Sequence, residues 1–286
     1  MKITCIGGCA ISLTGVPQSV LRLRDSNIGT IQETVGGVAF KIASNLASLE
    51  DCTVSLISAV GADEMGEKII KGAVDAGIDV SRISKEPGPS GRYVTILDSD
   101  RDLLASISDL SVMSSLTPER LGAHLEAINT GDAVLMDANL SAEAIHFLVE
   151  NVKVPLFYEP VSRKKALRIQ DGLGKCFAVK PNRFEAAALS GCSCDSVRGA
   201  FRAAEFFLKE GVKQVYISMG SEGIVYADAA NGCGHIDAEP ILAVDTAGAG
   251  DVMYAAIIHS AILGGSVEKN AKAGNHASAC FCSRQL

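Results

Sequence analysis

Residues Asp245–Asp251 read Asp-Thr-Ala-Gly-Ala-Gly-Asp and form a glycine-rich loop whose groups could carry out phosphoryl transfer. Gly248 and Gly250 allow a sharp backbone turn and leave the amide N–H groups unobstructed by side chains. Amides at a helix N-terminus bind anions such as phosphate. Asp251 lies where the next helix should begin and could accept a proton from a substrate hydroxyl. The loop therefore predicts an anion site at the amides of Ala249, Gly250 and Asp251, with a general base beside it.

The same loop has a simpler interpretation, a strand–turn–helix connection in which an Asp caps the helix. An apolar run at 241–244 predicts a strand before the loop, and the pattern at 252–258 predicts a helix after it. No Gly-Lys-Ser/Thr follows the glycines, so the loop is not a nucleotide-binding P-loop. Met253 stands where a dinucleotide fingerprint would have its third glycine, which argues against that motif as well.

Along the chain, short apolar runs alternate with helical patterns, which is typical of parallel β-α units in an α/β fold. Strands buried on both faces should appear as apolar runs, and most of these do. The predicted strands cover 3–6, 54–58, 133–136, 156–158, 177–179, 214–218, 224–226 and 242–244. The predicted helices cover 37–49, 63–76, 118–128, 142–151, 183–189, 196–210, 249–263 and 267–280.

Two segments, 14–33 and 92–107, depart from this rhythm. Each shows strand-like alternation with no helix between its halves, so we expect extended segments appended to the main sheet. Repeats and low-complexity linkers are absent from the sequence. We therefore expect one α/β domain over 1–286.

Composition excludes several classes of protein. The chain has 286 residues, 48% of them hydrophobic, and contains no apolar run long enough to cross a membrane. Its net charge of −7 argues against nucleic acid as a main partner. The nine cysteines are odd in number and several lie in apolar segments, which favours free thiols. With no signal-peptide pattern at the start, we expect a cytoplasmic protein.

The glycine-rich loop closely resembles the C-terminal signature of the ribokinase-like (PfkB) family of sugar and nucleoside kinases. Further family landmarks follow in order at 36–47, 58–66, 179–185 and 219–223. The resemblance implies a three-layer sandwich around a mostly parallel sheet, with a small β-sheet lid made by 14–33 and 92–107. It also implies that Asp251 is the catalytic base and that the amides of the Gly-Ala-Gly segment form the anion hole.

The resemblance further implies ATP and Mg²⁺ as cofactors, and leaves open whether K⁺ assists the anion-hole loop. Asn182 and Glu185 match the family's N-x-x-E motif, which organises magnesium, with Glu185 as the metal residue. Asn182 could equally cap a helix with Glu185 at its third position, and we expect both roles. Lys180 could reach a phosphate or be an ordinary solvated lysine. The remaining nucleotide-binding candidates are Ser218, Gly220, Gly223 and Thr246.

Several stretches, among them 25–31, 107–109, 137–139, 160–162 and 180–183, are most similar to the pseudouridine kinase subfamily. That subfamily phosphorylates the 5′-hydroxyl of a C-glycosidic nucleoside. The substrate-binding candidates are Ser12, Asp25, Asn27, Gly36, Gly37, Lys41, Asp109 and Asn139. A solvated turn is the alternative for the exposed acidic positions among them.

The chain departs from the family on the sugar side. Ala10 and Ser12 stand where the family has Asn and Asp, and Lys41 replaces an Asn that contacts sugar. A hydrogen bond to a charged partner contributes about 1.5–3 kcal/mol, so losing two contacts would weaken sugar binding about 10²- to 10⁴-fold. Lys41 could compensate by contacting a hydroxyl or an anionic substrate. Glu159 and Ser108 also differ from the family, and the short segment after the last helix predicts a looser adenine pocket.

Three hypotheses about function follow. The first is an ATP-dependent kinase that converts pseudouridine to pseudouridine 5′-phosphate. The second is a kinase for another small sugar or nucleoside, such as ribose, a ketose or an adenosine-like nucleoside. The third is a poorly catalytic ligand-binding relative, against which the complete loop with Asp251 argues. The exposed edges of a lid sheet further predict a homodimer formed through the lid.

Overall fold

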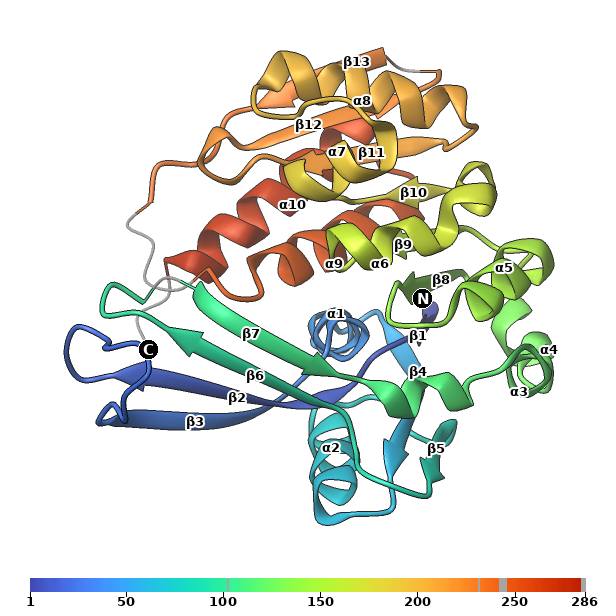
Figure 1. Cartoon of the computed structure of the whole chain (residues 1–286). Coiled ribbons are helices and arrows are strands. Elements are labelled where there is room, and N and C mark those ends of the chain that lie inside the picture. The colour runs from blue at the N-terminus through green and yellow to red at the C-terminus, as the bar shows by residue number, and fades with distance from the viewer. Residues whose placement is uncertain (102, 231, 242–245, 284–286) are drawn as a thin grey trace.

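The computed structural model describes residues 1–286 except 102, 231, 242–245 and 284–286. Within these residues the main sheet has nine strands in the order β13-β12-β11-β10-β9-β8-β1-β4-β5 (Figure 1). All neighbours are parallel except β12, which runs antiparallel to both β11 and β13. The strands are β1 (Lys2–Ile6), β4 (Thr53–Gly61), β5 (Ile83–Glu86), β8 (Ala133–Asp137), β9 (Leu156–Glu159), β10 (Ala178–Val179), β11 (Gln214–Ser218), β12 (Ile224–Asp228) and β13 (Gly232–Ile236).

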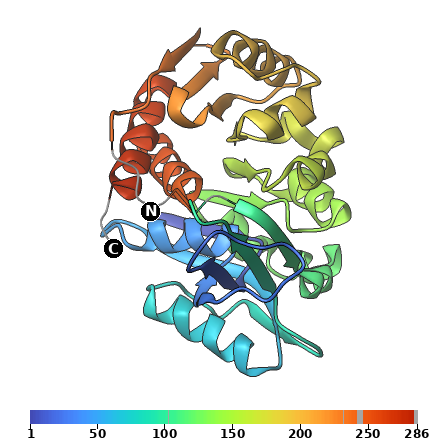
Figure 2. The same cartoon turned by 60° about the vertical axis from the view of Figure 1, so that its left-hand side comes forward.

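Helices cover both faces of this sheet, as Figures 1 and 2 show. One face packs against α1 (Val38–Ala47), α2 (Glu64–Asp75), α9 (Ala249–Ile262) and α10 (Val267–Cys282). The other packs against α3 (Pro118–Gly122), α4 (Leu125–Asn129), α5 (Ala142–Asn151), α6 (Arg163–Ala166), α7 (Arg183–Ser190) and α8 (Val197–Lys209). Each face has its own apolar cluster because the central strands are buried on both sides. The expected three-layer α/β sandwich is confirmed.

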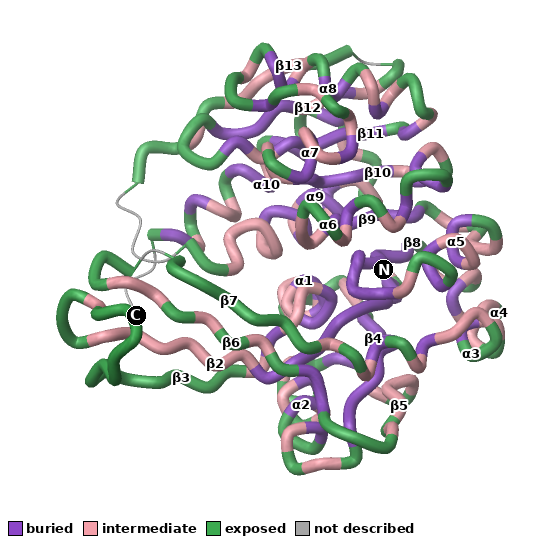
Figure 3. Tube along the Cα trace, viewed as in Figure 1, coloured by how far each residue is buried: buried purple, intermediate pink, exposed green. Residues whose placement is uncertain are grey.

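A second, four-stranded sheet stands beside the main sheet and forms the lid. Its strands are β2 (Ala10–Pro17), β3 (Gly29–Gly36), β6 (Arg92–Leu97) and β7 (Leu103–Asp109), in the order β3-β2-β6-β7. Figure 3 shows that most of β3 and β7 is exposed. The lid begins at residue 10 rather than 14, because Ala10 and Ile11 already pair with β3 and are buried.

Several predicted boundaries were wrong for local reasons. The helix predicted at 118–128 is two short helices, because His124 donates its amide to the oxygen of Leu121 and interrupts the helical pattern. The short elements α6, β5 and β13 and the 3₁₀ helix Leu167–Lys175 were missed, since they carry too few apolar residues for a clear period. The strand predicted at 242–244 lies outside the described residues.

Two further expectations concern thiols and membranes. All nine cysteines are free thiols, as the sequence predicts. Among the described helices, none combines the length and apolarity that a bilayer span requires. Neither disulfides nor a spanning helix therefore contributes to the described fold.

Tyr254 fixes α9 to the sheet. Its buried hydroxyl lies 3.1 Å from the carbonyl oxygen of Tyr158 and 3.0 Å from that of Ala178, and it shares its proton between them. Its ring packs edge-on against Phe157, with the ring centroids 6.2 Å apart. Because Tyr254 lies one turn after Asp251, these contacts position the start of α9 at the carboxyl ends of β9 and β10.

We predict that Tyr254→Phe lowers the free energy of unfolding by about 1–3 kcal/mol, because two buried carbonyl groups lose a donor. Urea denaturation followed by circular dichroism measures the change. Tyr226→Phe is the matched control, since no hydrogen bond of its hydroxyl occurs among the described residues. Equal stability of the two variants would contradict this account of how α9 is anchored.

Candidate active site

The glycine-rich loop ends in the first turn of α9. Gly248 is the N-cap residue with φ of 107°, a left-handed conformation that favours glycine. The amide of Ala249 donates to Thr246 (3.1 Å) and that of Asp251 to Gly248 (3.0 Å). The amide of Gly250 has no acceptor among the described residues. Two of the three predicted anion-hole amides are therefore already bonded, and within the described part of the chain the Gly250 N–H at the helix N-terminus stays open.

Asp251 is the third residue of α9 and is half-buried. Burial raises the pKa of its carboxyl to about 6, and the carboxylates of Asp137 and Glu185 act in the same direction. The ammonium groups of Lys41 and Lys180 oppose the rise. A carboxylate with a pKa this near neutrality can both accept a proton and release it, as a general base requires.

Lys41 and Lys180 approach the loop from two elements. A Cβ placed on Gly250 would lie 3.5 Å from Nζ of Lys180, and one on Gly248 would lie 3.7 Å from Nζ of Lys41. Lys180 follows β10 directly, and Lys41 lies in the first turns of α1. Since both side chains carry a positive charge, the loop presents an open amide between two ammonium groups.

Lys180 forms a buried ion pair with Glu159, whose Oε2 is 3.0 Å from Nζ. Burial opposes the charge of Lys180, but Glu159 and Glu185 outweigh that effect and raise its pKa. Burial raises the pKa of Glu159 to about 8, against the attraction of Lys180. Lys180 is therefore not the solvated lysine of the alternative interpretation.

Asn182 and Glu185 form the predicted capping box at the start of α7, which is confirmed. The side-chain oxygen of Asn182 accepts the amides of Phe184 (2.9 Å) and Glu185 (3.0 Å), and Oε2 of Glu185 accepts the amide of Asn182 (2.9 Å). The carboxyl groups of Glu185, Glu159 and Asp251 all interact with Lys180. Such a group of carboxyl oxygens fits Mg²⁺, which prefers oxygen ligands, binds few protein groups and keeps its waters.

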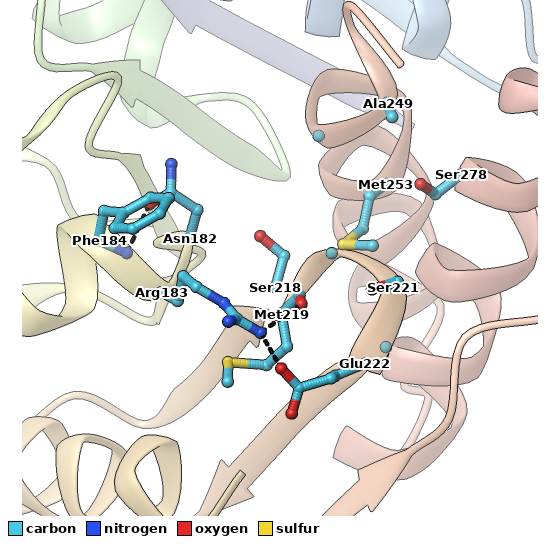
Figure 4. A pocket seen from close by; sticks show the side chains of 13 residues that line it. Asn182, Arg183, Phe184, Ser218, Met219, Ser221, Glu222, Ala249, Met253 and Ser278 are labelled. Atoms are coloured by element: carbon cyan, nitrogen blue, oxygen red, sulfur yellow. Dashed lines mark hydrogen bonds and ion pairs between the residues drawn. The ribbon is translucent and has the colours of Figure 1, made fainter. Parts of the chain in front are cut away.

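A cavity of about 500 Å³ opens on one side of the loop (Figure 4). Four of the predicted nucleotide-binding residues, Asn182, Ser218, Gly220 and Gly223, line it together with Ala249 and Gly250. Arg183, which the sequence did not single out, donates to the carbonyl oxygen of Met219 (2.7 Å) and pairs with Glu222. A neighbouring cavity of about 440 Å³ shares Gly220, Ser221, Ala249, Met253 and Ser278 with it and also contacts Thr246.

A cavity of about 450 Å³ lies on the other side of the loop, beneath the lid. Ser12, Lys41 and Thr246 line it, as do lid residues that the sequence did not single out. The period-two alternation of the lid strands could have identified these, because residues on one face of a strand are two apart. The further lining residues are Thr14, Val16, Gln32, Thr34, Tyr93, Thr95, Leu97, Asp100, Arg101 and Ala247.

Three predicted substrate-binding residues do not reach this cavity. Asp25 and Asn27 lie in the exposed β2–β3 connection, where Asn27 accepts the amide of Arg22 (2.8 Å) and shapes the turn. Asp109 ends β7 and accepts the amide of Ser111 (3.1 Å). Each of these residues bonds within its own connection, and Asp25 and Asn27 line a separate cavity of about 610 Å³ at the lid.

Gly36, Gly37 and Asn139 have structural roles. A Cβ on Gly37 would lie 2.3 Å from the oxygen of Gly8, and one on Gly36 would lie 2.5 Å from Oγ of Ser12. Both glycines therefore allow close packing where β3 meets α1. Asn139 is buried, donates to Asp137 (2.9 Å) and accepts from Lys165 (2.7 Å), and it does not line the cavity beneath the lid.

One other group of potential metal ligands, Asp51, Cys52 and His259, occurs in the described part of the chain. Nε2 of His259 lies 3.0 Å from Oδ1 of Asp51, and Sγ of Cys52 lies 3.7 Å from the same oxygen. These residues thus pair with one another and link the end of α9 to the turn before β4. They are remote from the loop along α9 and do not belong to this site.

We predict that Lys180→Met lowers the free energy of unfolding by about 3–5 kcal/mol at pH 9, because it leaves the buried Glu159 carboxylate without a partner. The double variant Lys180→Met/Glu159→Gln should recover part of the loss, since the uncompensated charge is gone. Denaturation of both single variants and the double variant measures the coupling. Additive effects of the two substitutions would contradict a stabilising role for the pair.

Comparison with known proteins agrees with this geometry. The sequence profile of the pfkB family of carbohydrate kinases matches residues 1–286. The chain is 32% identical over 257 residues to a pseudouridine kinase from Escherichia coli K12, covering 89% of this chain and 82% of that protein. It is 28% identical over 283 residues to a guanosine-inosine kinase from Exiguobacterium acetylicum, covering 96% and 91%.

Solved structures show the same fold. An Escherichia coli protein described as a ribokinase II, in complex with ATP and Mg²⁺, superposes with a TM-score of 0.82 at 22% identity. The superposition covers 99% of this chain and 93% of that one. From the profile match over the whole chain and the identity to the pseudouridine kinase, this protein belongs to the pfkB family of carbohydrate kinases.

Proposed function

We propose that this kinase transfers the γ-phosphoryl group of ATP, with Mg²⁺, to the 5′-hydroxyl of pseudouridine. The observation that carries the proposal is the position of the glycine-rich loop between two cavities of about 500 and 450 Å³. Ala249 and Gly250 line the first cavity, Thr246 and Ala247 line the second, and Asp251 follows in the first turn of α9. Cavities of this size suit small organic ligands. The fold neighbour solved with ATP and Mg²⁺ supports the choice of donor. The nine free thiols support a cytoplasmic location.

The reaction depends on alignment and charge neutralisation. Asp251 accepts the proton of the acceptor hydroxyl, whose oxygen then bonds to the γ-phosphorus as the bond to ADP breaks. The Gly250 amide and the Lys180 ammonium stabilise charge on the transferred group. Glu185, with Glu159 close by, would hold magnesium, which when bound neutralises phosphate charge. K⁺ belongs to the proposal as an additive to vary, on the family resemblance alone.

The choice of acceptor rests on the relatives and on the lid cavity. Both curated relatives named above are nucleoside kinases, which supports a nucleoside acceptor. A second candidate, a kinase for another sugar or nucleoside, is favoured by Ser12 and Lys41 in the acceptor cavity, where the family has Asp and Asn. A binding protein without turnover is disfavoured, since such a protein has no use for a half-buried Asp251 beside two lysines.

We predict ADP release with ATP, Mg²⁺ and pseudouridine, tested beside uridine, adenosine, guanosine, ribose and fructose, with and without K⁺. Asp251→Asn should lower the rate about 10²- to 10⁴-fold, since it removes the proton acceptor. The wild-type rate should rise as the pH passes about 6, because the base must be ionised. If only another acceptor is turned over, that compound replaces pseudouridine as the proposed substrate. An unchanged rate in Asp251→Asn would refute Asp251 as the catalytic base.

We also propose that two copies pair through the outer face of the lid. This face carries apolar side chains that do not line the acceptor cavity beneath the lid. Ile31 is 77% exposed and Ile107 is 73% exposed. Val94 and Ile96 lie on the same face, opposite Ile107 and Ala105. A contiguous exposed apolar face of this kind is typical of an interaction surface.

We predict that the wild-type protein sediments with twice the mass of one chain and that Ile31→Asp/Ile107→Asp sediments with the mass of one. The charges would have to be buried without partners in the dimer, which is strongly unfavourable. Val74→Asp, on an exposed position of α2, is the control and should leave the dimer intact. A monomeric wild-type protein at micromolar concentration would rule out the lid dimer.

A further inference from the structure

Lys41 places an ammonium group beside the glycine-rich loop, where no described residue forms an ion pair with it. The Cβ position of Gly248 lies 3.7 Å from Nζ of Lys41 and 3.9 Å from Oδ2 of Asp251. No ion pair or hydrogen bond of Nζ occurs among the described residues, whereas Lys180 on the other side is paired with Glu159. The Lys41 ammonium is therefore available to a further anion.

Its location is electrostatically unfavourable in the absence of an anion. The N-terminus of a helix such as α9 carries about half a positive charge, which repels a nearby cation. Lys180 adds a second ammonium next to the same turn. Asp251 offsets this only in part, because its one carboxylate faces both the Lys41 ammonium and the positive end of the helix. An anion bound at the open Gly250 amide would offset the remaining positive charge.

The Lys41 side chain extends from α1 past Gly36 to the place where the loop meets the cavity beneath the lid. The Cβ position of Gly36 is 3.7 Å from Cε of Lys41, an ordinary contact distance, so the lysine stem lies against Gly36. Lys41 also lines the lid cavity with Ser12 and Thr246. Its ammonium thus lies where the acceptor cavity meets the loop.

We propose that Lys41 is a catalytic residue that binds the transferred phosphoryl group and stabilises its charge in the transition state. This inference rests on the proposed phosphoryl transfer. As the acceptor oxygen bonds to phosphorus and the bond to the ADP oxygen breaks, the acceptor proton passes to Asp251. Lys41 keeps its own protons throughout and acts by its charge and by hydrogen-bond donation. Contact with the neutral acceptor alone is the competing role for the same side chain.

Steady-state kinetics of Lys41→Met, Lys41→Asn and Lys41→Arg separate the two roles. We expect kcat to fall about 10²- to 10³-fold in the Met and Asn variants, the usual effect of losing one donor to developing charge. The Arg variant should keep more activity because it retains the cation. Lys213→Met, an exposed lysine far along the chain in front of β11, removes the same charge and should behave as wild type. A higher KM for the acceptor with unchanged kcat would overturn the proposal.

The pH profile gives a second readout. Lys41 lowers the pKa of Asp251, so its removal raises that pKa. The acidic limb of the kcat/KM profile should therefore move to higher pH in Lys41→Met and stay in place in Lys213→Met. An unmoved limb would show that the ammonium does not act at the reacting groups.

A binding experiment distinguishes failure of this inference from failure of the proposed function. Calorimetry with ADP, Mg²⁺ and aluminium fluoride, which imitates a transferred phosphoryl group, needs no acceptor. We expect Lys41→Met to bind ADP alone as wild type does and to lose at least about tenfold of the affinity gained with aluminium fluoride. The wild type could turn over no acceptor while Lys41→Met still loses this affinity. The proposed function would then fail, and the role of Lys41 would stand. Equal gains in both proteins would overturn that role.

Discussion

The ion pair between Lys180 and Glu159 is the interaction on which the arrangement of the site depends. Both residues lie at the carboxyl ends of adjacent strands, and both side chains are buried. A buried charge is tolerated only with a close partner, so the pair fixes where the Lys180 ammonium can lie. That ammonium lies 5.6 Å from the ring centre of Tyr254 and next to Gly250. One interaction therefore connects the sheet, α9 and the glycine-rich loop.

The two halves of the site are built differently. The proposed nucleotide side rests on the main sheet and on helix termini, where the fold itself supplies hydrogen-bond partners to Asn182, Glu185 and Tyr254. The proposed acceptor side is assembled largely from one face of the lid, with Ser12 from β2 and Lys41 from α1. Side chains on that face can change without disturbing the core. This is why the chemistry of the reaction is clearer from the residues than the identity of the acceptor.

The sequence predicted those parts of the fold that depend on local pattern. The bounds of α5 and β11 were right, because each is a regular run with clear ends, and Ser141 caps α5 through the amide of Ala144. The capping box of Asn182 was visible for the same reason. The interruption of the helix at His124 could not be predicted, since it depends on one backbone hydrogen bond. Local periodicity does not show whether such a segment forms one helix or two.

The candidate site was predictable where a motif fixed it and unpredictable where tertiary contacts decided. Asp251 and Gly250 could be predicted from the sequence of the loop. The hydrogen bond of the Ala249 amide could not, because it depends on where the fold places the oxygen of Thr246. The sequence did not show that Asp25 and Asp109 lie away from the cavity beneath the lid and that each accepts an amide of its own connection. The ion pair of Lys180 was equally hidden, because its partner lies on another strand.

The most direct test of the account uses ATP labelled with ¹⁸O on its γ-phosphoryl group. Products are analysed by mass spectrometry after incubation with Mg²⁺ and the acceptor that supports turnover. The account predicts that the phosphorylated acceptor carries all of the labelled γ-oxygens, since transfer from ATP to the hydroxyl beside Asp251 is direct. Label found only in inorganic phosphate, with the acceptor unmodified, would contradict phosphoryl transfer at this site.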